Sequence, residues 1–156
     1  MMKRKVLKTK IFCDSADIKI IKQLNKNPLV SGFTTNPSLM KLVGAKNYKN
    51  YSQKILKICK NKPISFEVFA DDSKGMEKQA YEINSWGQNV YVKIPVINTK
   101  GNFSGKVIKL LSDKGIKLNI TAVYTAVMLS FKPLSLNRFI TLPEKLPFVF
   151  VTGIFT

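Results

Sequence analysis

The sequence contains no histidine, only two cysteines, and only two arginines among its 26 basic residues. The lack of histidine excludes a Ser-His-Asp triad and the usual imidazole acid or base. Cys13 and Cys59 do not form a CxxC motif, which argues against a zinc site and indicates a reducing, cytoplasmic setting. No apolar run is long enough to cross a bilayer, and the basic N-terminus lacks a small-residue cleavage site, so neither a membrane span nor a secretory signal is expected.

Acidic residues are also scarce, with nine Asp and Glu against 26 Lys and Arg and a formal net charge of +17. A charge of this sign makes a basic nucleic-acid-binding domain one function to weigh. The lysines are scattered over polar helix faces, however, with no aromatic stacking platform between them. The sequence is also rich in Lys, Asn, Ile and Phe, which A/T-rich codons encode. A compositionally biased, solvated surface therefore explains the charge better, and nucleic-acid binding is kept as the rival hypothesis.

Strand-like and helix-like segments alternate along the 156 residues. Such alternation predicts parallel βα units with right-handed crossovers, and the length predicts a single domain over residues 1–156. Strands are expected at 10–14, 63–70, 89–96 and 116–124, and a strand followed by a loop at 29–37, which Pro37 stops. A short turn is expected at 38–43, and helices at 15–27, 47–59, 74–86 and 103–115.

Two architectures fit this order, an open doubly wound sheet and a (β/α)8 TIM barrel. Polar side chains stand near the carboxyl ends of four expected strands, always on the parity opposite to the apolar residues; they are Asp14, Glu67, Lys93, and Asn119 with Thr121. Active sites of TIM barrels are built at this carboxyl face. No GxGxxG or GxxxxGK loop follows any strand, which weakens the nucleotide-binding alternative. The pattern favours the barrel.

Lys93 stands inside the apolar segment "NVYVKIPV", where an ammonium is costly unless it is paired or neutralised. One explanation is an edge strand whose lysine reaches solvent. The other is a desolvated amine that attacks a carbonyl and forms a Schiff base. That chemistry needs acids to move protons, and Asp14 and Glu67 are the acids at strand ends. Asp14 could instead cap the helix that Ser15 or Asp17 begins, and Glu67 could lie on an exposed strand face.

Four amide and hydroxyl side chains could bind a hydroxyl-rich substrate, namely Thr34, Asn36, Asn119 and Thr121. Each also has a plainer interpretation. Asn36 precedes Pro37 and is an ordinary loop initiator, while Asn119 and Thr121 could satisfy buried backbone groups.

Five segments resemble, in order, the motifs of the transaldolase family, specifically its short members related to fructose-6-phosphate aldolase: "IFCDSADI", "SGFTTNPSLM", "ISFEVFADD", "VYVKIPV" with "KGN", and "GIKLNITAVYTA". The likeness covers residues 10–126. It implies a TIM barrel and a class I aldolase-type mechanism without metal or cofactor. It further implies transfer of a dihydroxyacetone unit from a ketose phosphate, such as fructose 6-phosphate or sedoheptulose 7-phosphate, to an aldose phosphate in the pentose phosphate pathway.

The resemblance also implies a role for each matching residue. Lys93 falls on the Schiff-base lysine, and Asp14 on the aspartate that shuttles a proton at the hydroxyl next to the cleaved bond. Glu67, with Thr121, falls on the group that handles the catalytic water. Substrate contacts are implied for Thr34, Asn36 and Asn119. Glu67 favours transaldolase over the related aldolases, which tend to carry glutamine there. The expected partners are sugar phosphates, and a homo-oligomer is left open.

After Ala126 the likeness stops, and residues 127–156 form a divergent tail. No Gly-Arg pair for a substrate phosphate follows, and that role is not transferred to Arg138. "LPFVFVTGIF" could form a sixth strand, which leaves nothing for strands seven and eight. A complete barrel takes about 200 residues or more. The expectation is therefore an incomplete barrel of five or six strands, arising from a frameshift or truncation or completed by a partner chain. An inactive remnant is a further alternative.

Overall fold

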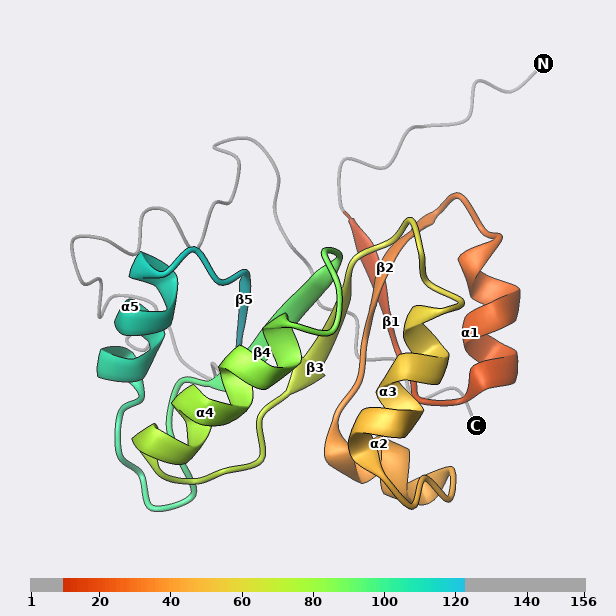
Figure 1. The fold of residues 1–156 in the computed structure, drawn as a ribbon. Coiled ribbons are helices and arrows are strands. Elements are labelled where there is room, and N and C mark those ends of the chain that lie inside the picture. The colour runs from red at the N-terminus through yellow and green to blue at the C-terminus, as the bar shows by residue number, and fades with distance from the viewer. Residues whose placement is uncertain (1–9, 123–156) are drawn as a thin grey trace.

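The computed structural model of the chain describes residues 10–122, which form one parallel sheet of five strands with helices between them (Figure 1). The elements in chain order are β1 (Ile11–Asp14), α1 (Ile18–Asn25), β2 (Val30–Thr34), α2 (Pro37–Leu42), α3 (Tyr48–Leu56), β3 (Ile64–Glu67), α4 (Ser73–Asn84), β4 (Val90–Pro95), α5 (Gly105–Asp113) and β5 (Leu118–Thr121).

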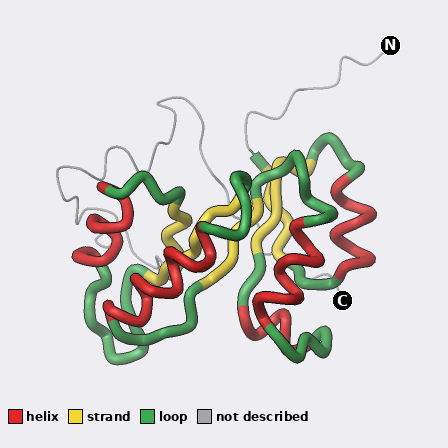
Figure 2. The backbone as a smooth tube through the Cα atoms, in the orientation of Figure 1, coloured by secondary structure: helices red, strands yellow, loops and turns green. Residues whose placement is uncertain are grey.

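The strand order is β1-β2-β3-β4-β5, and every neighbouring pair is parallel. A doubly wound sheet reverses its strand order at a switch point, which this sheet does not do. The strands instead follow one another around a curl, with the helices on one side of it (Figure 2). The described residues therefore confirm an open part of a (β/α) barrel rather than the doubly wound alternative.

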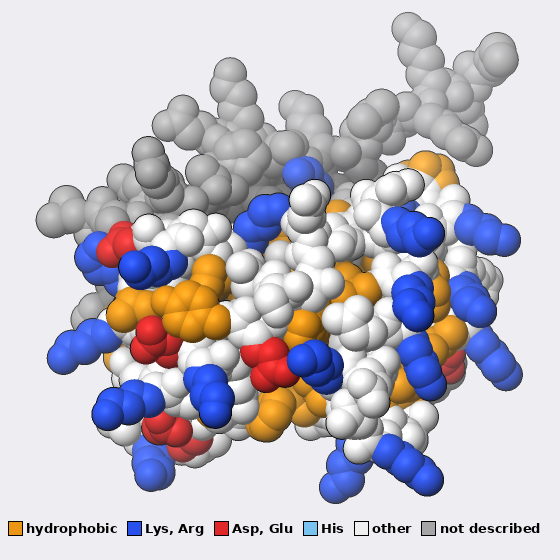
Figure 3. All heavy atoms as spheres, in the orientation of Figure 1, with side chains coloured by type: hydrophobic (Ala, Val, Ile, Leu, Met, Phe, Trp, Pro, Cys, Tyr) orange, Lys and Arg blue, Asp and Glu red, His pale blue; other side chains and the backbone are white. Residues whose placement is uncertain are grey.

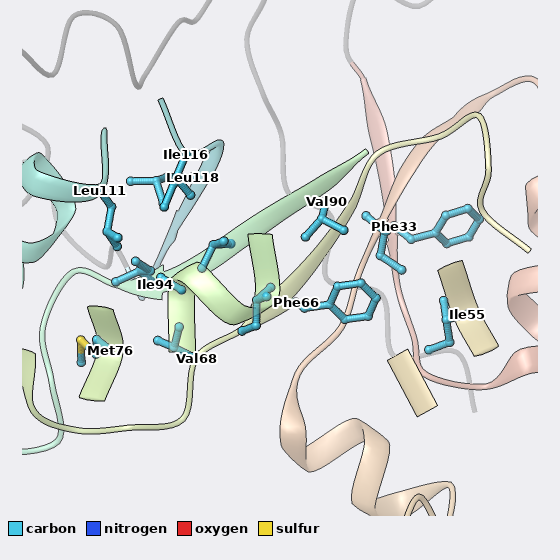
Figure 4. Packing of buried hydrophobic residues seen from close by; sticks show 14 of the residues in the cluster. Phe33, Ile55, Phe66, Val68, Met76, Val90, Ile94, Leu111, Ile116 and Leu118 are labelled. Carbon is cyan, nitrogen blue, oxygen red and sulfur yellow. The ribbon is translucent and has the colours of Figure 1, made fainter. Parts of the chain in front are cut away.

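The hydrophobic core lies between the sheet and the helices (Figure 4). Burial in β4 alternates residue by residue: Val90, Val92 and Ile94 are buried, while Tyr91 and Lys93 are intermediate. This is the period of two that the sequence predicts. On the helical side, Ile21, Ile55 and Leu111 are fully buried, and each such side chain contributes about 1.5–3 kcal/mol by leaving water. The apolar parity faces the helices, so the polar parity faces the inside of the curl.

Side-chain caps fix where the helices begin. The Asp17 carboxylate accepts hydrogen bonds from the Lys19 and Ile20 amides, so Asp17 rather than Ser15 is the N-cap of α1. Asn36 caps α2, with Pro37 in its first turn. An N-cap followed by a proline with fixed φ is a good helix start, which explains why 38–42 is helical and not the expected turn.

The helices end near the expected positions. Gly115 has φ +76° and follows α5, as expected for a C′ glycine. β3 is shorter than expected and stops at Glu67, while β2 ends at Thr34 and is followed by the expected loop before Pro37. None of the helices in the described range 10–122 is long and apolar enough to cross a membrane. The segment expected as a sixth strand, and Arg138, lie outside the described residues.

Candidate active site

Lys93 and Glu67 form an ion pair on the inner face of the sheet. The parallel register of β3 and β4 sets the two residues side by side. Lys93 Nζ lies 3.3 Å from Glu67 Oε2, and the two side chains are only 12% and 20% exposed. Because β4 lies between β3 and β5 in the sheet, Lys93 is not on an edge strand. The solvent-reaching explanation of this lysine, and the exposed-face explanation of Glu67, are therefore wrong.

Burial dominates the electrostatics of Glu67. It raises the pKa of the carboxyl group above its usual value, and the Lys93 ammonium offsets this only in part. The Asp14 carboxylate raises the pKa of Glu67 further, so the two acids are close enough to repel each other. A carboxyl group with a raised pKa holds a proton more readily than an ordinary glutamate. That property suits a group that exchanges protons with a neighbouring amine or with water.

Asp14 is held by a neighbouring strand. Asp14 and Thr34 are partners in the β1–β2 register, and Thr34 Oγ1 donates to Asp14 Oδ1 at 2.8 Å. Thr34 is itself buried. The hydrogen bonds from the first amides of α1 go to the Asp17 side chain and not to Asp14. The capping explanation of Asp14 is therefore wrong, and its carboxylate stands on the inner face of the sheet with Thr34.

Asn119 lies next to Lys93 in the β4–β5 register. Its Nδ2 donates to Ser65 Oγ at 3.0 Å, reaching across from β5 to β3. Ser65 was not among the residues expected in the site, although its parity, two positions before Glu67, is the signal that could have found it. Thr121 ends β5 opposite Pro95, and its carbonyl oxygen accepts from the Val96 amide at 2.9 Å.

Asn36 has the plainer role that its sequence allowed. Its Oδ1 accepts from the Leu39 amide at 2.8 Å and caps α2. A substrate contact through the rest of this amide stays a prediction. The structure thus pairs Lys93 with Glu67 and brings Asp14 near enough to affect Glu67 electrostatically, while Asn36 is engaged in holding its own helix.

One residue that the sequence did not indicate contacts the site. Tyr48, near the start of α3, donates its hydroxyl to the Glu67 carbonyl oxygen and accepts from the Glu67 amide, both at 3.0 Å. Nineteen residues separate the two positions. No local spacing rule links a helix tyrosine to a strand end at that distance.

A polar cleft of about 410 Å³ opens between the loops that follow β3 and β4. Its lining residues are Asp71, Asp72, Ser73, Asn98, Lys100 and Asn102. These loops leave the same end of the sheet that carries Glu67 and Lys93, but the cleft includes none of the predicted site residues. Within residues 10–122, no group of three or more His, Cys, Asp or Glu is arranged to hold a metal ion.

The lysines that give the chain its charge lie mostly on the outer surface. Figure 3 shows Lys side chains spread over the helical face and separated by uncharged atoms. Exposed examples on α1 and α3, or directly after them, are Lys19, Lys22, Lys26, Lys54 and Lys57. Lys93 differs from them because it projects from the sheet and is mostly buried.

The chain matches a family model described as Transaldolase/Fructose-6-phosphate aldolase over residues 11–129. A protein of Methanococcus maripaludis named "Probable transaldolase" is 42% identical over 119 residues, which are 75% of this chain and 52% of the relative. Proteins of the same name from Dehalococcoides mccartyi and Clostridium acetobutylicum are 39% and 38% identical and cover 74% and 75% of this chain. The chain spans about half the length of the curated relatives it matches. With the curled parallel sheet and the inner-face ion pair, these matches show that the chain belongs to the transaldolase/fructose-6-phosphate aldolase family.

Proposed function

We propose that this chain carries the Schiff-base chemistry of a transaldolase, with Lys93 as the nucleophile. The substrate is a ketose phosphate, such as fructose 6-phosphate or sedoheptulose 7-phosphate, and the transferred group is a dihydroxyacetone unit. The acceptor is an aldose phosphate. The proposal includes a cytoplasmic setting in the pentose phosphate pathway, in keeping with free thiols at Cys13 and Cys59.

The first step needs a neutral amine. Glu67, 3.3 Å from Lys93 Nζ and with its pKa raised by burial, is placed to take the ammonium proton. The amine then attacks the ketone carbon, a C–N bond forms, and the proton that the nitrogen loses passes to the carbonyl oxygen. Glu67 returns a proton to this hydroxyl, which leaves as water, and an iminium remains. We assign Thr121 to holding that water together with Glu67.

The second step breaks the carbon–carbon bond next to the iminium. Asp14 takes the proton of the adjacent hydroxyl, the C–C electron pair moves into the iminium, and an aldose phosphate leaves. The resulting enamine stays on Lys93 until an acceptor aldehyde arrives, when the same electron movement runs backward. Thr34 donates to Asp14 at 2.8 Å and so keeps one carboxylate oxygen oriented. Asn36 and Asn119 are proposed as substrate contacts.

The single observation that supports this proposal is the pairing of Lys93 with Glu67 on neighbouring central strands, with Asp14 near enough to act on Glu67 electrostatically. An acid whose pKa is raised by burial, beside a mostly buried lysine, is typical of functional sites. The relatives named "Probable transaldolase" supply the reaction class.

Borohydride trapping tests the proposal. Incubation of the chain with fructose 6-phosphate and sodium borohydride should give a covalent secondary amine on Lys93, detected by intact mass and located by peptide mapping. Lys93→Met should abolish the adduct. Lys62→Met is the matched control, because Lys62 is also only partly exposed and donates to the Asn27 carbonyl oxygen at 2.8 Å; this variant should label like the wild type. Equal labelling of wild type and Lys93→Met would contradict the proposal.

A further inference from the structure

The backbone of Glu67 lies just beyond the last hydrogen bond between β2 and β3. This bond runs from the Thr35 amide to the Ser65 carbonyl oxygen at 3.1 Å. Two residues further along each segment, the next bond would join residue 37 to Glu67. Residue 37 is a proline, which has no N–H to donate and here begins α2. The carbonyl oxygen of Glu67 therefore needs a donor from another element, and the Glu67 amide is free to bond to the same group because β2 ends at Thr34.

Tyr48 supplies that partner with a single hydroxyl. Its O–H donates to the Glu67 carbonyl oxygen and its oxygen accepts from the Glu67 amide, each at 3.0 Å. One side chain from α3 thus replaces both bonds that a continued β2 would have made. On its other side, Glu67 is followed by Val68, whose amide donates to the Lys93 carbonyl oxygen at 3.0 Å. Glu67 is consequently held from both sides of β3.

The ring of Tyr48 is fixed as well as its hydroxyl. Its centroid lies 5.7 Å from that of Phe69 in an edge-on arrangement and 5.9 Å from that of Trp86. Burial raises the pKa of the Tyr48 hydroxyl, so the group stays protonated and able to donate at neutral pH. A packed ring with a protonated hydroxyl gives the end of β3 little freedom to shift.

We propose that Tyr48 is a positioning residue of the active site, which sets the Glu67 carboxylate against Lys93 by holding the Glu67 backbone from α3. The groups that face Glu67 are Lys93 on β4, Asp14 on β1 and the Tyr48 hydroxyl on α3. The two hydrogen bonds between Tyr48 and the Glu67 backbone support the placement of Glu67 without any assumption about the reaction. Its catalytic consequence rests on the proposed function, because it assumes that Glu67 exchanges protons during Schiff-base formation.

Tyr48→Phe tests this inference, because it keeps the packed ring and removes only the hydroxyl. The first readout needs no substrate and is the titration of the Glu67 carboxyl carbon by NMR. In the variant the end of β3 loosens and Glu67 gains water. Since burial is the largest cause of its raised pKa, the titration midpoint should fall toward that of an ordinary glutamate. An unchanged midpoint in a folded variant would overturn the proposal.

The second readout is the rate of borohydride trapping as a function of fructose 6-phosphate concentration. Misplacing a proton-transfer group should lower the limiting rate by about tenfold or more, while the half-saturating concentration changes much less. A purely structural role for Tyr48 would leave the limiting rate of the folded fraction unchanged. Tyr81→Phe is the matched control: Tyr81 lies on α4, is 41% exposed, and loses the same atom. It should alter neither readout.

The proposal stays testable if wild type forms no adduct and if Tyr48→Phe does not fold. If wild type forms no adduct, the transaldolase proposal fails, while the NMR titration still judges Tyr48. If Tyr48→Phe does not fold, hydrogen exchange of wild type decides instead. The Glu67 amide should then be protected to a degree similar to the Val68 amide, which bonds within the sheet. Rapid exchange at Glu67 would show that Tyr48 does not hold it, and the proposal would fall.

Discussion

Lys93 and Glu67 should be energetically coupled in the folded protein even when no substrate is present. The perturbation is a double-mutant cycle of Lys93→Met, Glu67→Gln and the two together. Each single substitution leaves the other group buried without its counter-charge, and the double substitution removes the pair altogether. The coupling free energy therefore isolates the interaction that the two side chains make with each other.

Its magnitude follows from the structure. At the Nζ–Oε2 separation of 3.3 Å, an effective dielectric constant of about 20 gives roughly 5 kcal/mol of attraction before desolvation is counted. Because burial already raises the pKa of Glu67, its carboxyl group can take up a proton when Lys93 is removed, and this relieves part of the attraction. A net coupling of about 1–3 kcal/mol is expected, within the range observed for contacting residues.

Urea unfolding of the four proteins at neutral pH measures this coupling. The control cycle uses Lys49 and Glu82, which lie 3.1 Å apart but are 56% and 49% exposed. Water screens that pair, so its coupling should be about 0–1 kcal/mol. A Lys93–Glu67 coupling no larger than that of the Lys49–Glu82 pair would refute the claim that the lysine and its acid form a desolvated pair inside the curl.

Three other predictions concern the scaffold and its pH response. Gly32→Ala should lower the free energy of unfolding by about 1–3 kcal/mol in urea titrations, because the new Cβ would lie 2.5 Å from Phe12 Cε1 and 2.7 Å from the Pro63 carbonyl oxygen; an unchanged stability would count against the packing of β1 on β2. Asp17→Ala should lower the thermal stability by about 1 kcal/mol through loss of the α1 cap, and a neutral result would contradict the cap assignment. The folded state favours the protonated form of Glu67, so the contribution of this residue to stability is fully present below the ordinary pKa of 4.5 and is lost as pH rises from there to the raised value. In this window Glu67→Gln should gain stability relative to wild type, and parallel stability curves would refute the assigned pKa direction.

Much of the sheet could be predicted from the chain because its signal is local. The alternation in "NVYVKIPV" predicts which side chains face the helices, and the burial of Val92 and Ile94 confirms it. Glu67 and Lys93 also share the polar parity of their strands and therefore one face, and their register makes them neighbours. Each of these inferences needs only the period of two of a strand and the parallel order of successive strands.

The features that were missed depend on contacts between distant segments. The end of β3 is set by Pro37, which cannot extend the β2 ladder, and by Tyr48, which comes from α3 to replace it. Neither fact is visible as a pattern in "ISFEVFA". The choice of Asp17 over Ser15 as a cap is likewise decided by backbone geometry, since Ser15 accepts from the Asp17 amide and both could have capped α1.

The identity of the lysine that forms the covalent intermediate is the most direct test of the account. After treatment with fructose 6-phosphate and borohydride, peptide mapping should find the added sugar-derived carbons on the peptide that contains Lys93 and on no peptide carrying one of the exposed helix lysines. An adduct confined to those surface lysines, with the Lys93 peptide unmodified in a folded sample, would contradict it.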